Sequence, residues 1–127
     1  MNNISKETVS KLLLEHSIEL MSTHSKLCYP IINRIYKKMA IGIKFPSIKV
    51  DGNLIIDGHH RYVASLLAGK KLYFVPSQKT SATIIYHWES IVLDIEDWDT
   101  DAKIRMLNEE DAKYNAIDID KLIDLLK

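Results

Sequence analysis

The sequence predicts an α+β fold in which N-terminal and C-terminal helices flank a small mixed sheet. Apolar residues recur with helical spacing near both ends of the chain, and β-branched runs flank Asp51-Gly52, a strong hairpin signal. The second of these runs changes to helical spacing at Asp57-Gly58. The chain has 127 residues, of which 46% are hydrophobic, and this suits one core. We therefore interpret residues 1–127 as a single domain.

Two helices are expected in the N-terminal part. Ser5 can cap the first, because a serine oxygen accepts a hydrogen bond from an unpaired N–H of the first turn. Its apolar positions recur every three or four residues: Val9, Leu12, Leu13, His16, Leu20 and Met21. Residues 22–26 are interpreted as a polar loop. Pro30 suits the first turn of a second helix, which ends at Gly42 and has four residues facing inward: Ile31, Ile32, Ile35 and Met39.

A hairpin and a third helix occupy the centre of the chain. The hairpin strands are expected at residues 45–50 and 53–56, on either side of Asp51-Gly52. The helix runs from about His59 to Gly69, and one face of it carries four apolar residues: Tyr62, Val63, Leu66 and Leu67.

Short strands and two further helices complete the pattern. The strands are expected at residues 72–75, 82–86 and 89–95. The acidic helical tail, at about residues 97–127, is interpreted as structural. Its helices have short polar residues as candidate caps, which are Asp99 or Thr100 for the first and Asp118 or Asp120 for the last.

The net charge of zero conceals an uneven distribution. Residues 1–80 contain twelve Lys and Arg against five acids, a net charge of +7, and residues 81–127 have a net charge of −7. A basic half can steer phosphates toward a site, and Arg34, Lys37 and Lys38 could edge a phosphate pocket. The alternative is that the two halves pair with each other or that their charges are solvated.

The junction between strand and helix gathers the unusual polar residues. Asp57 and Gly58 end the strand, and His59, His60 and Arg61 occupy the expected first turn. The first N–H groups of a helix lack partners and attract anions, and glycine lets a ligand approach the backbone closely. Basic side chains at this end of a helix lower stability unless an anion compensates them. The junction therefore predicts a phosphate site.

Phosphoryl transfer needs donors and cations around the phosphates, usually a divalent metal, and a carboxylate or imidazole that orients the nucleophile, so the catalytic candidates are Asp57, His59 and His60. Arg61 offers a fixed fork of donors and His60 a further donor, while Asp57 can hold a metal ion, orient a histidine or act as a base. Two adjacent rings cannot share one helix face, so we expect only one of His59 and His60 to point into the site. The structural alternatives are a surface histidine pair and an N-cap role for Asp57.

A cysteine-based site is not expected. The single Cys28 excludes an internal disulfide and is interpreted as a small buried hydrophobe rather than a nucleophile. A zinc site is not expected either, because His87 is isolated and no second cluster of His or Cys has ligand spacing.

The junction and its surroundings resemble the ParB/sulfiredoxin superfamily. The resemblance rests on a hairpin that runs into Ile-Asp-Gly-His-His-Arg-Tyr-Val-Ala-Ser at residues 56–65, then a helix ending in Ala-Gly and a strand ending in Val-Pro. It covers a core motif at about residues 30–76. In this superfamily the Gly-x-x-Arg turn and the helix that it opens bind nucleotide phosphates. The resemblance therefore implies that the phosphate-binding turn consists of Gly58, His59, His60 and Arg61.

Departures from the superfamily narrow the function that the resemblance implies. His59 stands where sulfiredoxins have a catalytic cysteine, so reduction of sulfinic acids is not expected. Chromosome-partitioning proteins have additional DNA-binding and dimerisation domains, for which we expect no room in this chain. The turn looks closest to that of free serine kinases, which transfer a phosphoryl group. Their catalytic glutamate lies in the N-terminal part, where Glu15 and Glu19 are the candidates.

Three classes of function follow. The first, which we favour, is a phosphotransferase or NTPase that uses ATP, ADP or CTP, with Mg²⁺ and a small-molecule acceptor. The second is a ParB-like nuclease, which could be the toxin domain of a larger secreted protein with an immunity protein as its partner. A nuclease should present a continuous basic track with aromatic residues, and the acidic tail argues against nucleic acid as a partner. The third is a non-catalytic module that senses nucleotides or binds a partner.

The sequence also bears on localisation. No apolar run reaches the roughly 18 residues needed to span a bilayer, and the first residues lack the pattern of a signal peptide. We therefore expect a cytoplasmic protein without a membrane partner, unless the domain is exported within a toxin polypeptide.

Overall fold

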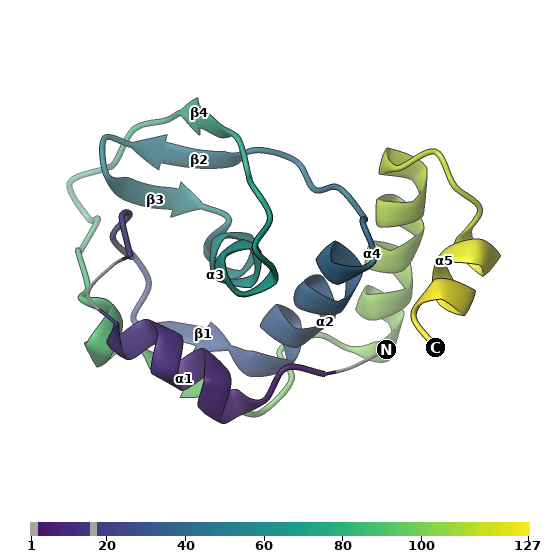
Figure 1. The fold of residues 1–127 in the computed structure, drawn as a ribbon. Coiled ribbons are helices and arrows are strands. Elements are labelled where there is room, and N and C mark those ends of the chain that lie inside the picture. Colours follow the sequence, from purple (N-terminus) through teal and green to yellow (C-terminus); the bar gives the residue numbers. More distant parts are fainter. Residues whose placement is uncertain (1–2, 16–17) are drawn as a thin grey trace.

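A computed structural model describes residues 3–15 and 18–127 of the chain. Its helices and strands confirm the α+β class (Figure 1). In chain order the elements are α1 (Lys6–Leu14), β1 (Lys26–Cys28), α2 (Tyr29–Ala40), β2 (Ile48–Asp51), β3 (Leu54–Asp57), α3 (His59–Ala68), β4 (Phe74–Pro76), the 3₁₀ turn η1 (Trp88–Ser90), β5 (Val92–Asp94), α4 (Asp101–Tyr114) and α5 (Ile119–Leu125).

The strands of the described residues form two small sheets. The first has the order β3-β2-β4, in which β2 is antiparallel to β3 and parallel to β4, and this confirms a mixed sheet. In the second sheet β1 and β5 pair in parallel. Figure 1 shows α3 end-on between the three-stranded sheet and β1, with α4 and α5 beyond α2. The helix that begins at the predicted phosphate turn is therefore central in the fold.

The main hydrophobic core surrounds α3. Tyr62 and Val63 of this helix belong to one buried cluster with Ile32 of α2, Ile48 of β2 and Ile55 of β3. Full burial of one such side chain stabilises the fold by about 1.5–3 kcal/mol. This packing fixes the position of α3 and of the junction at its start.

A smaller cluster attaches the C-terminal helices. Ile43, which follows α2, packs with Ala112 of α4 and Leu122 of α5. The side chain of Asn115 also accepts a hydrogen bond from the N–H of Lys44 at 2.6 Å and donates one to its carbonyl at 3.0 Å. The end of α4 is therefore held against the loop between α2 and β2.

The predicted turn and caps are confirmed. Gly52 has a φ of +59° in the turn between β2 and β3, and Gly69 ends α3 with a φ of +64°. The side chains of Ser5, Thr100 and Asp118 each accept a hydrogen bond from a first-turn N–H of α1, α4 and α5, respectively.

The first helix is shorter than predicted. It ends at Leu14, so Leu20 and Met21 do not lie on it, and His16 lies outside the described residues. The backbone of Met21 instead pairs with Leu54 of β3. Pairing with the hairpin therefore overrides the helical spacing, although Leu20 is still buried.

Two strands begin later than predicted. β2 starts at Ile48 rather than at residue 45, because the nearby Pro46 has no N–H to donate to a ladder. β4 starts at Phe74 and includes Pro76, which the sequence analysis placed after the strand. An edge strand tolerates proline, since one side of it is unpaired.

Three other segments differ from the prediction. Residues 82–86 contain an isolated bridge at Tyr86 in place of a strand. Lys26, assigned to a loop, begins β1, and the segment 89–95 divides into part of η1 and β5.

No helix in the described ranges, 3–15 and 18–127, is long and apolar enough to cross a membrane.

Candidate functional site

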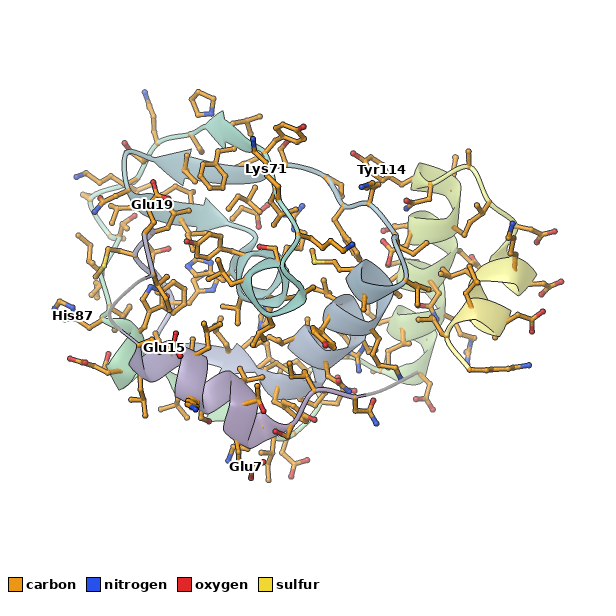
Figure 2. The ribbon with its side chains drawn as sticks, viewed as in Figure 1. Glu7, Glu15, Glu19, Lys71, His87 and Tyr114 are labelled. Atoms are coloured by element: carbon orange, nitrogen blue, oxygen red, sulfur yellow. The ribbon has the colours of Figure 1, made fainter. Side chains whose placement is uncertain are left out.

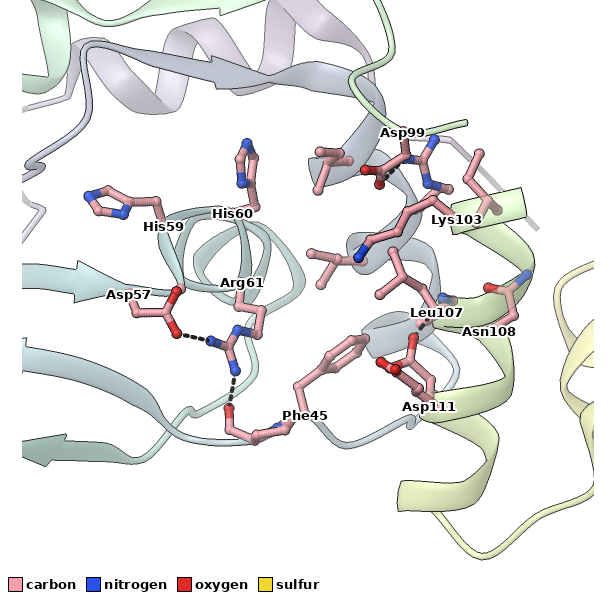
Figure 3. Close-up of a pocket in the computed structure, with 18 of the residues that line it drawn as sticks. Phe45, Asp57, His59, His60, Arg61, Asp99, Lys103, Leu107, Asn108 and Asp111 are labelled. Carbon is pink, nitrogen blue, oxygen red and sulfur yellow. Dashed lines mark hydrogen bonds and ion pairs between the residues drawn. The ribbon is translucent and has the colours of Figure 1, made fainter. Parts of the chain in front are cut away.

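A pocket of about 540 Å³ opens where α2, α3 and α4 meet. Figure 3 shows its walls, which include the end of β3, the first turn of α3, the loop at Phe45 and the facing side of α4. The carboxylate of Asp57 is 66% exposed, so solvent reaches the junction. The five candidate residues of the junction line this pocket: Asp57, Gly58, His59, His60 and Arg61.

Gly58 is the N-cap of α3 and has a φ of +101°. A Cβ atom here would lie 2.5 Å from Cγ2 of Ile48 and 2.9 Å from Nη2 of Arg61, so only glycine fits without displacement. No side chain caps the first turn, and the alternative N-cap role for Asp57 is therefore wrong. Because the first N–H groups of a helix have no partner within it, they stay available to a ligand.

Arg61 lies against Gly58 and holds the adjacent loop. Its Nη1 donates to the carbonyl of Pro46 at 3.1 Å and to that of Ser47 at 3.4 Å, and its Nη2 contacts the carboxylate of Asp57 at 3.4 Å. The expectation of an uncompensated cation is wrong for this residue. A guanidinium carries five N–H donors, so donors remain for a ligand.

The ring of His59 is buried and neutral. Its Nε2 accepts a hydrogen bond of 3.0 Å from the N–H of Thr23, since a backbone N–H can only donate. The ring proton must therefore lie on Nδ1, which is buried and has no hydrogen-bond partner among the described residues. Burial, with smaller contributions from His24 and His60, lowers the pKa of His59 to about 3. The ring of His24 stacks on it, with 3.9 Å between the centroids.

His60 is held in the same tautomer. Its Nε2 accepts a hydrogen bond of 2.9 Å from the N–H of Cys28, which leaves the proton on Nδ1. The ring of Trp98 packs at right angles, 5.4 Å away between centroids. Burial, and then His24, lower the pKa of His60 to about 4, while Asp99 acts in the opposite direction.

The two histidines are suited to donate hydrogen bonds rather than to act as acids or bases. With pKa values near 3 and 4 both rings are neutral at pH 7, so the expectation that they add cations to the first turn is wrong. Both residues line the pocket. Figure 3 shows that the ring of His59 and the ring of His60 point to different sides of α3, as expected for adjacent residues of a helix.

Two cations of α2, Arg34 and Lys38, pair with the acidic tail, whereas Lys37 does not line the pocket. Arg34 forms ion pairs with Asp97 and Asp99, and Nζ of Lys38 lies 2.7 Å from the carboxylate of Asp111. Each pair joins the basic half of the sequence to the acidic half. For these residues the structure confirms intramolecular pairing, the alternative to phosphate steering.

Lys103 is a pocket residue that the sequence analysis missed. The acidic tail, interpreted from the sequence as structural, supplies a wall of this pocket through α4. Figure 3 shows Lys103 extending from the first turn of α4 toward the start of α3. It forms no ion pair within the described part of the chain. The sequence contained one indication of this role: Lys103 lies in the first turn of a predicted helix, where acidic residues are preferred.

Other candidates lie outside the pocket. Neither Glu15 nor Glu19, the glutamates considered from the kinase resemblance, lines it, and Figure 2 shows both on the side of the molecule away from α4. Cys28 is buried, as expected, and its thiol donates to the carbonyl of Glu96 at 3.4 Å. The described residues contain no group of three or more His, Cys, Asp or Glu that could hold a metal ion.

Comparisons of the chain with family models, curated proteins and solved structures give no match. The resemblance to the ParB/sulfiredoxin superfamily therefore stays a prediction from the residues of the junction.

Proposed function

We propose that the pocket at the start of α3 binds the phosphate groups of a nucleotide, and that the protein is a nucleotide-dependent phosphotransferase or NTPase. One observation carries the proposal: the residues lining the pocket include donors without acceptors. These are the N–H groups of the first turn of α3, which no side chain caps. Nδ1 of His59 in the same turn also has no partner among the described residues, but it is buried, so the backbone N–H groups are the donors offered to a ligand. An anionic acceptor at these N–H groups would be stabilising, because the start of a helix attracts negative charge.

The described residues of the pocket lining include four cations, Arg34, Lys38, Arg61 and Lys103, and four carboxylates, Asp57, Asp99, Glu110 and Asp111, so binding of an anion depends on local positive groups and not on a net charge. Arg34, Lys38 and Arg61 are each compensated by a carboxylate, whereas Lys103 is unpaired among the described residues. The start of α3 adds a partial positive charge of about half an elementary unit. In this proposal Lys103 contacts phosphate oxygens as a point charge, and His60 donates to them through its neutral Nδ1–H.

Asp57 is the candidate base. The histidines cannot take a proton from an acceptor hydroxyl at pH 7, because their pKa values are near 3 and 4 and their Nε2 atoms already accept hydrogen bonds. The exposed carboxylate of Asp57 is held by one contact of 3.4 Å to Arg61 and is free to accept that proton or to hold a metal ion. Mg²⁺ is usually bound by one or two carboxylates together with phosphate oxygens, and Asp57 fits this requirement. The ion would neutralise charge on the phosphates.

The resemblance of residues 56–65 to the phosphate-binding turn of the ParB/sulfiredoxin superfamily supports the same assignment. It does not extend to the catalytic glutamate of the serine kinases, since neither Glu15 nor Glu19 lines the pocket. Asp57 takes the role of the catalytic carboxylate in this proposal.

Thermal-shift and calorimetric titrations with ATP, ADP, CTP and GTP, each with and without Mg²⁺, test the proposal. A ligand that binds only the native state stabilises it by about 2.7 kcal/mol at a concentration of 100 Kd. Lys103→Ala should weaken binding about ten-fold, the effect of losing a charge-assisted hydrogen bond worth about 1.5 kcal/mol. Arg105→Ala is the matched control, because Arg105 is an exposed cation on the same helix that does not line the pocket.

Added salt should weaken nucleotide binding, since exposed charges are screened over a Debye length of about 8 Å at physiological ionic strength. Failure of all four nucleotides to bind, or equal losses in Lys103→Ala and Arg105→Ala, would contradict the proposal. If the protein turns over a nucleotide and Asp57→Asn abolishes this turnover, the result would support the enzymatic function. Binding without turnover would favour a nucleotide-sensing module.

A further inference from the structure

A second surface of the molecule combines cations with exposed aromatic rings. Two hollows of about 370 and 390 Å³ share residues 70–73, the segment that joins α3 to β4. Such volumes lie within the range of about 300–1,000 Å³ that is typical of ligand pockets. We call this surface the basic aromatic groove and define it by Lys44, Lys70, Lys71, Tyr73, Phe74 and Tyr114.

The groove carries uncompensated positive charge. Its three lysines are exposed and form no ion pair within residues 3–15 and 18–127. Among the described residues that line the two hollows, only Glu19 is acidic. This contrasts with the nucleotide pocket, where Arg34, Lys38 and Arg61 all have carboxylate partners. A polyanion would therefore meet free cations at the groove.

The aromatic rings of the groove are available for stacking. Tyr73 is 70% exposed and Tyr114 is 57% exposed, and neither ring stacks on another ring of the described chain. Nζ of Lys71 lies 5.5 Å from the centroid of Tyr73. Figure 2 shows Lys71 and Tyr114 on the same side of the molecule. Proteins bind single strands through such neighbouring groups, because bases stack on the rings while lysines contact the phosphates.

The backbone beneath the groove is held in place. Asn115 bonds to both the N–H and the carbonyl of Lys44, and the carbonyl of Tyr73 accepts a hydrogen bond of 3.0 Å from Ile48 of β2. Lys70 donates its N–H to the carbonyl of Ser65 in α3 at 3.0 Å. The loop at Lys44, the end of α4 and residues 70–73 are therefore fixed before a ligand arrives, so binding requires little ordering of the backbone.

We propose that the basic aromatic groove binds single-stranded nucleic acid. An acidic peptide would satisfy the lysines but would leave the flat faces of Tyr73 and Tyr114 without stacked partners. Unpaired bases supply those partners, which favours a single strand over a duplex. Phe45 lines both the nucleotide pocket and the first hollow, so the two sites are adjacent. The inference goes beyond the proposed nucleotide site and does not depend on it, because no residue of the groove lines that pocket.

Fluorescence anisotropy with labelled oligo(dT) of about twelve nucleotides tests the groove. The double variant Lys70→Ala/Lys71→Ala should bind at least about five-fold more weakly than wild type, and its slope of log K against log salt should be shallower by about 1.4. Tyr73→Ala should weaken binding by about five-fold or more through lost stacking. These side chains are exposed, so melting temperatures should stay close to that of the wild type.

The matched control is Lys11→Ala/Lys121→Ala, which removes the same charge from exposed sites on α1 and α5. Absence of oligo(dT) binding at low salt, or equal losses in the two double variants, would overturn the inference. A polyglutamate peptide that displaces oligo(dT) and binds Tyr73→Ala as well as wild type would assign the groove to acidic peptides instead.

Lys103→Ala separates this inference from the proposed function. Oligo(dT) binding that falls in Lys103→Ala but not in the groove variants would place the strand in the nucleotide pocket and overturn the groove. Failure of mononucleotides to bind, with oligo(dT) binding that depends on Tyr73, would contradict the proposed function and support the groove.

Discussion

Replacement of Gly58 by alanine tests the close packing on which the junction depends. Gly58 has a φ of +101°, and a residue with a Cβ is less stable in the left-handed region by about 1–2 kcal/mol. The new Cβ would also lie 2.5 Å from Cγ2 and 2.9 Å from Cβ of Ile48. Ile48 is fully buried, so it cannot move freely, and overpacking of a core costs about 1–3 kcal/mol. We therefore expect Gly58→Ala to lower the free energy of unfolding by about 2–5 kcal/mol.

Urea unfolding followed by circular dichroism measures this loss. Gly69→Ala is the matched control, since Gly69 ends the same helix with a φ of +64° but has no described heavy atom within 4 Å of the Cβ position. The control should lose only the conformational contribution of about 1–2 kcal/mol. The difference between the two variants is then the steric contribution of Ile48. Equal losses would refute the close approach of Gly58 to β2.

The remaining predictions concern Arg61, a buried ion pair and the histidines. Arg61→Ala should lower the free energy of unfolding by about 1–3 kcal/mol, because two loop carbonyls lose their donor; urea unfolding measures it, and an unchanged midpoint would contradict the contacts. Asp111→Ala should lower the free energy of unfolding by about 3–5 kcal/mol in the same assay, because the ammonium of Lys38, whose side chain is 6% exposed, loses its partner. A smaller decrease than that of Lys38→Met would contradict this prediction. The pKa values of His59 and His60 lie below the ordinary value of about 6.5. Above about pH 6.5 both rings are neutral in the folded and in the unfolded chain, so the folded state keeps its full stability there. As pH falls from about 6.5 toward 4, the unfolded chain takes up protons that the folded chain does not, and stability should fall by up to about 1.4 kcal/mol per pH unit for each ring. Equal urea midpoints at pH 7 and pH 5 would show that the rings are not buried as neutral groups.

Local features of the fold could be predicted because they depend on neighbouring residues. The hairpin at Asp51-Gly52, the cap at Thr100 and the end of α3 at Gly69 each require only a few adjacent positions, and all three are confirmed. β1 was missed because its three residues pair with β5, far along the chain. No local pattern distinguishes such a strand from a polar loop.

The position of the candidate site was easier to predict than its chemistry. Its candidate residues adjoin one another on one junction, so a single turn brings them to the pocket. His59 and His60 were taken for cations, but they are neutral because they are buried and accept hydrogen bonds from Thr23 and Cys28. Lys103 was missed because it reaches the pocket from a helix that follows much later in the sequence.

An NMR titration with nucleotide tests the central claim most directly. In the free protein, the imidazole nitrogen shifts should report a proton on Nδ1 of both His59 and His60. With added ADP or ATP we predict saturable shifts of the backbone amides of Gly58 to Arg61, since the first-turn N–H groups would gain an acceptor. A nucleotide that binds while these resonances stay unchanged would contradict a phosphate site at the start of α3.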